Sequence, residues 1–187
     1  MLALTREKFL GHLQEIPHLI FLYQKGADNF VKETIVWLEQ TEESLLQLRN
    51  PLASFVASER GKIAAVHDGY IAPDVEITSR TKRKAQSVSA LLAICRVEAA
   101  MQKTINQIDT QFNVWREKMA QFIAVATTYE SIPFPPEEPR NAWIISVWKN
   151  FTITDETRGM YNYLNTAMCQ SDRVYLLNDL LENLINN

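Results

Sequence analysis

Four cations lie close together near the middle of the chain, at Arg80, Lys82, Arg83 and Lys84. The apolar spacing that follows them predicts that they occupy the start of a long helix. The helix dipole disfavours a cation at that end by about 0.3 kcal/mol or more, whereas the free amide groups there favour phosphate and carboxylate groups. The run is therefore a candidate anion-binding site. The alternative interpretation is a solvated turn, because charge runs commonly keep a loop soluble.

The surrounding segment is also basic. Residues 59–103 carry 8 Lys and Arg against 5 Asp and Glu, whereas residues 1–58 carry 5 against 7 and residues 104–187 carry 6 against 10. If the chain folds back on itself, Arg60 and Lys62 join the same basic end. Such a patch predicts weak, salt-sensitive contact with nucleic acid, although no base-reading motif accompanies it. An acidic protein or an anionic lipid surface fits the patch equally well.

Arg60 and His67 lie seven residues apart on a predicted helix, so their side chains share one face. An arginine and a histidine in this arrangement could hold a phosphodiester and move a proton at neutral pH. The spacing resembles the Arg-x4–6-His motif of HEPN-type ribonucleases, which implies a small helical bundle that acts on RNA as a dimer. Gly61 departs from that motif, because a polar residue usually follows the arginine. The alternative is that His67 is a C-terminal helix residue that the dipole favours.

Trp143 and Trp148 are five residues apart on a short predicted helix and therefore lie on different faces. We expect one of the two side chains to be exposed. Aromatic residues are enriched at the centres of protein interfaces, so the 141–151 helix is the predicted protein-contact surface.

No metal site, cofactor or established catalytic set is predicted. Glu98 falls on an apolar helix face, where a carboxylate must be paired, protonated or at an edge. Glu15-Ile-Pro-His18 is the only Glu-x-x-His sequence, and its proline argues against a di-metal bundle site. His12 and His18 have no evident partner, and we find no Ser/His/Asp set, phosphate loop or nucleophile elbow. Only Arg60 and His67 remain as catalytic candidates.

The elements that position these residues are predicted to be helices throughout, which gives an all-α fold. One apolar seam indicates a helix from about residue 81 to about 129, on the order of 70 Å long. A helix of that length must pack along much of its surface, so we expect it to form an antiparallel helical hairpin with the segment at about 28–68. A second copy of the chain is the other candidate partner. The seam comprises Leu91, Ile94, Glu98, Met101, Ile105, Ile108, Phe112, Trp115, Met119, Phe122 and Ala126.

Prolines and caps mark the predicted boundaries. Pro17 is expected to restart a short helix, and at Pro51 the 28–68 arm either kinks or restarts with Asn50 as its cap. Residues 131–139 hold four prolines and form a stiff connector to a C-terminal helical subdomain at 140–187. Within that subdomain Thr154 is a predicted helix cap. The whole chain, 1–187, is expected to be a single all-α domain with its shorter terminal helices packed on the hairpin.

Composition places the chain among ordinary globular proteins. It has 187 residues, 47% of them hydrophobic, and a formal net charge of −3. These values exclude a disordered or collagen-like chain and argue against wholesale wrapping by nucleic acid. No segment reads as a signal peptide or transmembrane helix, so a cytoplasmic location is expected. Cys95 and Cys169 are predicted to be buried free thiols.

The sequence favours a non-catalytic helical interaction, scaffold or regulatory protein over an enzyme. Self-association as a homodimer along the seam at 91–126 belongs to this hypothesis. The alternative is a protein directed at RNA or another polyanion through the basic end near 80–84, including a HEPN-like ribonuclease. Fold class does not separate the two hypotheses, because function depends on sites and not on folds.

Overall fold

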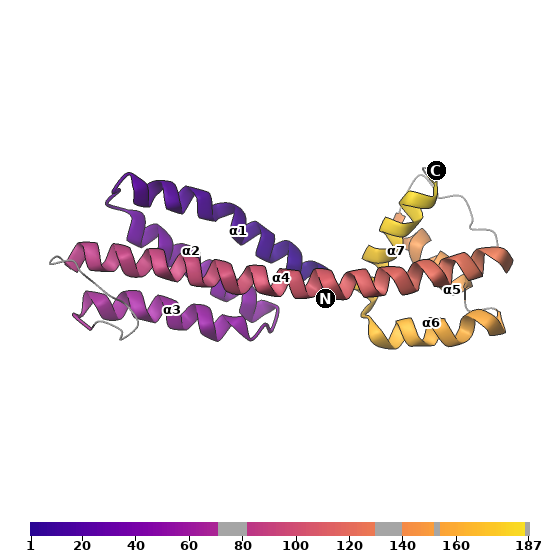
Figure 1. Ribbon diagram of the computed structural model, residues 1–187. Helices are drawn as coiled ribbons and strands as arrows, with labels where there is room; N and C mark the ends of the chain where they lie inside the picture. Colours follow the sequence, from indigo (N-terminus) through magenta and orange to yellow (C-terminus); the bar gives the residue numbers. More distant parts are fainter. Residues whose placement is uncertain (71–81, 130–139, 152–153, 186–187) are drawn as a thin grey trace. The chain divides into compact units, whose positions relative to one another are not determined.

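The computed structural model describes residues 1–70, 82–129, 140–151 and 154–185. Over these ranges the chain is helical without strands, which confirms the all-α prediction (Figure 1). The helices are α1 (Leu2–Gln24), α2 (Phe30–Gln47), α3 (Leu52–His67), α4 (Lys82–Tyr129), α5 (Arg140–Asn150), α6 (Asp155–Ala167) and α7 (Gln170–Ile185).

The chain divides into two compact units, and the division falls inside α4. The first unit contains Met1–Leu4 and Asn106–Asn187, and the second contains Thr5–Ile105. Each unit has its own core of buried apolar side chains. The predicted connector at 131–139 lies outside the described residues.

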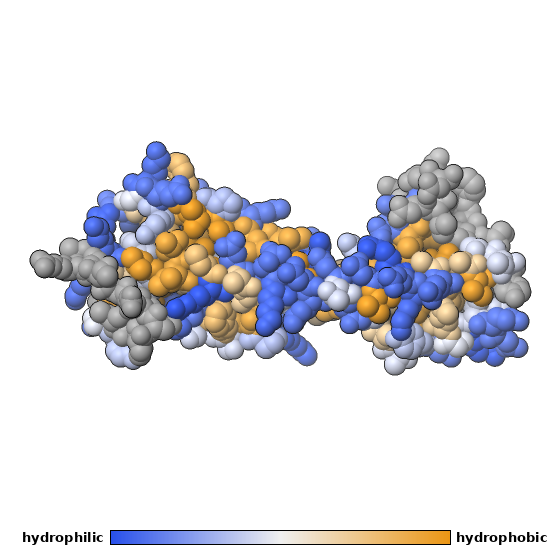
Figure 2. All heavy atoms as spheres, in the orientation of Figure 1, coloured by the Kyte–Doolittle hydropathy of each residue, from blue (hydrophilic) through white to orange (hydrophobic). Residues whose placement is uncertain are grey.

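In the second unit, α1, α2 and α3 lie along the first half of α4 (Figure 1). Its core includes the fully buried Phe9, Leu38, Ile63 and Ile94, one from each helix. Figure 2 shows that hydrophobic residues also reach the surface of this unit between α1 and α4. Leu10, Leu13, Ile20 and Leu91 are among the partly buried residues that pack against this core.

The predicted arm at 28–68 is two helices, because the chain turns between α2 and α3. Arg49 adopts the left-handed conformation, with φ of 52°, directly after the end of α2. The Asn50 N–H then donates to the Leu45 carbonyl at 2.8 Å, and the Asn50 side-chain oxygen accepts from the Leu52 N–H at 3.0 Å. The restart alternative at Pro51 is therefore the correct one.

The expected interruption at Pro17 is wrong, because α1 runs through it without a break. A proline inside a helix loses one backbone hydrogen bond, and packing must compensate for that loss. Ile16 and Leu19, on either side of Pro17, are both buried in the core of the second unit.

In the first unit, α5, α6 and α7 surround the second half of α4 (Figure 1). Aromatic side chains dominate this core: the Phe122 ring centroid lies 5.4 Å from that of Trp148 and 5.4 Å from that of Phe151. The predicted cap of α6 is confirmed, since the Thr154 hydroxyl accepts from the Thr157 N–H at 3.4 Å.

The apolar seam of α4 is confirmed along most of its length, with one correction. The positions from Met101 to Ala126 are all buried, whereas Leu91 is half-buried and Glu98 is exposed. Val97 takes the place predicted for Glu98, at 1% exposed. Helices of the same chain cover the seam, since its residues lie in the cores of the two units.

Candidate functional site

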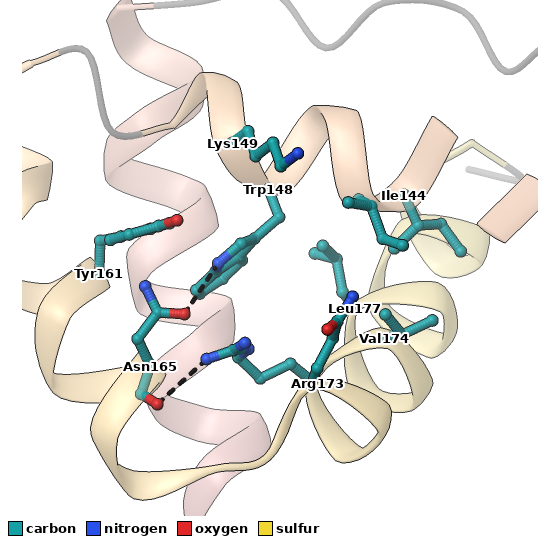
Figure 3. A pocket seen from close by; sticks show the side chains of 10 residues that line it. Ile144, Trp148, Lys149, Tyr161, Asn165, Arg173, Val174 and Leu177 are labelled. Atoms are coloured by element: carbon teal, nitrogen blue, oxygen red, sulfur yellow. Dashed lines mark hydrogen bonds between the residues drawn. The ribbon is translucent and has the colours of Figure 1, made fainter. Parts of the chain in front are cut away.

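A pocket of about 180 Å³ opens in the first unit between α5, α6 and α7 (Figure 3). We call it the Trp148 pocket. Its lining comprises Ile144, Ile145, Trp148, Lys149, Tyr161, Asn165, Gln170, Arg173, Val174 and Leu177.

The indole of Trp148 is held in place from two sides. Its Nε1–H donates to the side-chain oxygen of Asn165 at 3.3 Å. The Tyr161 ring stacks on it with centroids 4.9 Å apart and an interplanar angle of 24°. Paired aromatic rings in this range attract one another beyond the effect of burial. The indole is therefore a fixed wall of the pocket.

Arg173 joins the end of α6 to the same wall. Its Nη1 donates to the Asn165 carbonyl at 3.1 Å and to the Met168 carbonyl at 3.5 Å, and its guanidinium carbon lies 5.8 Å from the Trp148 ring (Figure 3). Carbonyls at the end of a helix lack intrahelical partners and favour a cation. Among the described residues, no acceptor contacts the Nε and Nη2 of Arg173, which is one of the residues that line the pocket.

The pocket combines apolar walls with side chains that carry a positive charge. Ile144, Val174 and Leu177 supply aliphatic surface, while Arg173 and Lys149 supply positive charge (Figure 3). A cavity of about 150 Å³ is large enough to hold a benzene ring. The Trp148 pocket can therefore hold one apolar group whose attached carboxylate binds Arg173.

Both tryptophans of the predicted contact helix are 7% exposed. The expectation that one of them is exposed is wrong, because α5 packs against α4 through Trp148 and Phe122 and is covered by α7 as well. Trp143 belongs to the core of the first unit. Trp148 belongs to that core and also lines the pocket.

Three of the four predicted anion-binding cations lie in the first turn of α4. Lys82, Arg83 and Lys84 are exposed there. Arg83 forms an ion pair with the exposed Asp28. Arg80 lies outside the described residues.

The guanidinium of Arg60 binds two glutamates of α2. Its Nε and Nη2 donate to the Glu42 carboxylate at 3.2 and 2.9 Å, and its Nη1 donates to Glu39 at 3.2 Å. His67 is the last residue of α3, and its side chain lies outside the described part of the structure. Arg60 is thus neutralised by α2.

Glu59, and not Glu98, is the carboxylate that the core encloses. It is 2% exposed, and Lys62 and Arg96 donate to it at 2.7 and 3.4 Å. Sequence reasoning missed Glu59 although a signal exists, because it lies three residues after the buried Val56 and four before the buried Ile63.

The two thiols are exposed, so the expectation that they are buried is wrong. Cys95 follows the buried Ile94 and therefore lies off the seam of α4, and Cys169 lies between α6 and α7.

The described ranges contain no group of three potential metal ligands and no helix long and apolar enough to cross a membrane.

Sequence reasoning also missed the polar residues of the Trp148 pocket. Tyr161, Asn165 and Arg173 come from two helices that no local pattern places beside α5.

Comparison of the chain with known protein families, with curated proteins and with solved structures found no match.

Proposed function

We propose that this chain is a helical interaction or scaffold protein that binds a short acidic and apolar segment of a partner protein in the Trp148 pocket. One observation carries the proposal. Arg173 has two donors without acceptors among the described residues, and it stands beside an apolar cavity sized for one large side chain. Binding at such a place requires no chemical step.

The chemistry of the pocket favours a carboxylate attached to an apolar group over either alone. Arg173 and Asn165 both present N–H groups, and a charge-assisted hydrogen bond to a carboxylate is about twice as strong as a neutral one. Trp148 and Leu177 line the pocket with apolar surface. A few well-packed contacts of this kind supply much of the binding energy at protein interfaces. The segment 141–151, predicted as a contact surface, contributes Trp148 to this pocket.

N-acetylphenylalanine is a minimal probe of this proposal, because it carries one aromatic side chain and one carboxylate. Titration into the full chain, followed by the NMR resonance of the Trp148 indole N–H, should show saturable binding. N-acetylphenylalaninamide lacks the carboxylate and should bind about tenfold more weakly, a loss typical of one charged hydrogen bond.

Asn165→Asp is the sharpest variant, since it keeps an oxygen acceptor for Trp148 while placing a negative charge in the pocket. It should abolish binding of the carboxylate probe. Arg158→Gln is the matched control, because Arg158 is exposed on α6 and pairs with Asp155. Equal binding of both probes to all three proteins would contradict the proposal.

Self-association remains part of the proposed function. The seam of α4 is covered by the chain's own helices, so a homodimer has to use another surface. Sedimentation at tens of micromolar tests it: a monomer across the whole concentration range would remove the dimer and leave the pocket proposal intact. The exposed free thiols Cys95 and Cys169 support a reducing, cytoplasmic location as the setting.

A polyanion-binding function is the second candidate, and the exposure of Lys82, Arg83 and Lys84 favours it. Binding of a generic single-stranded RNA should weaken steeply between about 50 and 200 mM salt, and changing all three cations to Glu should abolish it. Absence of binding at low salt would remove this candidate. The ribonuclease version has less support, because Glu39 and Glu42 already bind Arg60.

A further inference from the structure

A histidine, a serine and a glutamate meet in the second unit, where α1 and α2 lie side by side. The His12 Nε2 lies 3.0 Å from the Ser44 hydroxyl oxygen. The His12 Nδ1 lies 3.6 Å from a carboxylate oxygen of Glu15, which is beyond hydrogen-bond distance, and it is buried without a hydrogen-bond partner among the described residues. His12 and Glu15 are one turn apart on α1, and Ser44 comes from α2. The chain thus brings a hydroxyl, an imidazole and a carboxylate close together.

We propose that Ser44, His12 and Glu15 form an acyl-transfer site that hydrolyses small carboxylic esters. The atoms match the roles: the nucleophile contacts the Nε2 of the imidazole and the carboxylate approaches its Nδ1. The distance from Ser44 to His12 lies within the range of nucleophile–base pairs, and the longer approach of Glu15 is common before substrate binds.

The hydroxyl of Ser44 differs from most helical hydroxyls of this chain. Thr34 and Ser87 each donate to the carbonyl four residues earlier in their own helix. That local bond is the ordinary choice for serine and threonine within a helix. Ser44 instead contacts the imidazole of His12 on the neighbouring helix, and its hydroxyl is the donor when His12 carries its proton on Nδ1.

The three side chains line an open cavity of about 560 Å³ that can admit a substrate. Gly11 also lines the cavity, and the space beside it is empty, because a side-chain carbon added there would meet nothing within 4 Å. Helical N–H groups are already bonded within α1 and α2, so a backbone oxyanion hole is not available. Lys8 lines the cavity one turn before His12 and can supply the positive charge instead.

The surroundings keep His12 in the state that a base requires. Burial lowers the pKa of His12 below its ordinary value of 6.5; the charge of Glu15 opposes this shift, and the charge of Lys8 adds to it. The charged groups lining the cavity are Glu7, Lys8 and Glu15, all from α1, and α2 contributes only the uncharged Ser44. The net shift therefore favours the neutral imidazole.

The reaction balances without a cofactor. The Ser44 oxygen bonds to the ester carbonyl carbon while its proton passes to the His12 Nε2. The bond from that carbon to the alcohol oxygen breaks, and the alcohol leaves with the proton from His12. Water then attacks the acyl group through the same base, which releases the acid and restores Ser44. The open, charged cavity favours a small, polar ester over a long acyl chain.

A fluorophosphonate probe tests the nucleophile directly in the full-length chain. Its phosphorus should bond to the Ser44 oxygen with loss of fluoride, and peptide mass spectrometry should find the adduct on Ser44. Ser58→Ala is the matched control, since Ser58 is exposed on α3. Labelling should persist in this control and vanish in Ser44→Ala.

Hydrolysis of p-nitrophenyl acetate tests the base. His12→Gln should lower turnover about 100-fold, the usual contribution of general-base catalysis, while its amide can keep the bond to Ser44 and preserve the fold. His18→Gln should leave turnover unchanged, because His18 is exposed on the same helix and does not line the cavity. Turnover of the wild type should rise with pH and reach its midpoint below pH 6.5.

The results separate the proposal from its alternatives. No adduct on Ser44, or equal turnover by the wild type, Ser44→Ala and His12→Gln with circular dichroism unchanged, would overturn the acyl-transfer site. A labelled Ser44 that depends on His12 would establish it. Either result leaves binding of N-acetylphenylalanine in the other unit unaffected, so the two proposals can fail independently.

Discussion

Asp172 is a buried carboxylate of α7 whose charge is matched by donors from the start of the chain. It is 2% exposed, and its two oxygens accept from the N–H groups of Leu2 and Ala3, both at 3.0 Å. Burial alone would raise the pKa of Asp172, but hydrogen bonds from the Met1 amine, the Ala3 N–H and Cys169 outweigh it and lower the pKa below 3.8. The carboxylate therefore also serves as the N-terminal cap of α1.

Asp172→Asn should lower the free energy of unfolding by about 1 to 3 kcal/mol at neutral pH, because an amide cannot accept all of these bonds. A folded-state pKa below 3.8 means that the stabilisation is present above about pH 4 and is lost as the pH falls through the folded pKa. Urea unfolding at several pH values should therefore show the wild type and the variant converging in acid. A difference that stays constant with pH would contradict this account.

Glu59 and Glu98 show what residue spacing alone could predict. Both fall at helical positions between apolar residues, so periodicity predicts a buried carboxylate at each. Only Glu59 is buried, and there Lys62 and Arg96 form ion pairs with it. Arg96, one of the two partners of Glu59, comes from α4 and is 37 residues away in sequence, so spacing within one helix could not predict this ion pair.

The apolar seam of α4 departs from a strict heptad pattern. Buried positions run from Ile94 to Val97, Met101 and Ile105, so three helical turns take eleven residues. Eleven residues in three turns is about 3.67 per turn, close to an undistorted α-helix. The strict heptad interpretation needs a tighter winding, and it placed Glu98 on the core side.

Val97→Ala should reduce the free energy of unfolding by about 2 kcal/mol, because it removes two buried methyl groups and leaves a cavity. Glu98→Ala should change it by less than about 0.5 kcal/mol, as is usual for an exposed position. Chemical denaturation of the two variants measures both values. A larger loss of unfolding free energy in Glu98→Ala than in Val97→Ala would mean that Glu98 lies on the core side of α4, as the heptad pattern predicts.

Arg49 provides a second test at this scale, since a residue with a Cβ atom occupies the left-handed region there. Gly26 has the same conformation just after α1, with φ of 63°. Arg49→Gly should raise the free energy of unfolding by about 1 kcal/mol, because glycine adopts this region without steric cost. Gly26→Ala should lower it by a similar amount.

Arg49→Ala is the control for the loss of charge, and thermal unfolding of the three variants is the measurement. Because alanine keeps the Cβ atom, this control should show no gain. A gain equal to that of the glycine variant would mean that the charge of Arg49, and not its backbone, causes the effect.

The whole molecule has two cores, and the residues of each come from one unit only. Ile63 and Leu164 are fully buried, one in each core. Ile63→Ala should speed hydrogen exchange in α2 and α3 while leaving α5 to α7 unchanged, and Leu164→Ala should do the opposite. Each substitution costs its own core about 2 to 5 kcal/mol. Mass spectrometry of exchanged peptides reads out both units at once.

Faster exchange throughout the chain after either substitution would contradict two separate cores. It would show instead that α4 passes the loss of one core to the other, as a single cooperative domain requires. The single-domain expectation for 1–187 therefore depends on the same measurement.

The sequence by itself determined the helices and most of the seam of α4, because a 3.6-residue period and helix caps are local signals. These local signals did not predict that the helix continues through Pro17, since only packing against a core makes a proline inside a helix tolerable. Tertiary structure alone decided which side chains meet. Ser44 lies 32 residues from His12, and the Trp148 pocket needs three helices at once. The mildly acidic chain has a basic middle, as its sequence shows, but the fold decides that Arg60 and Arg83 are paired with carboxylates there.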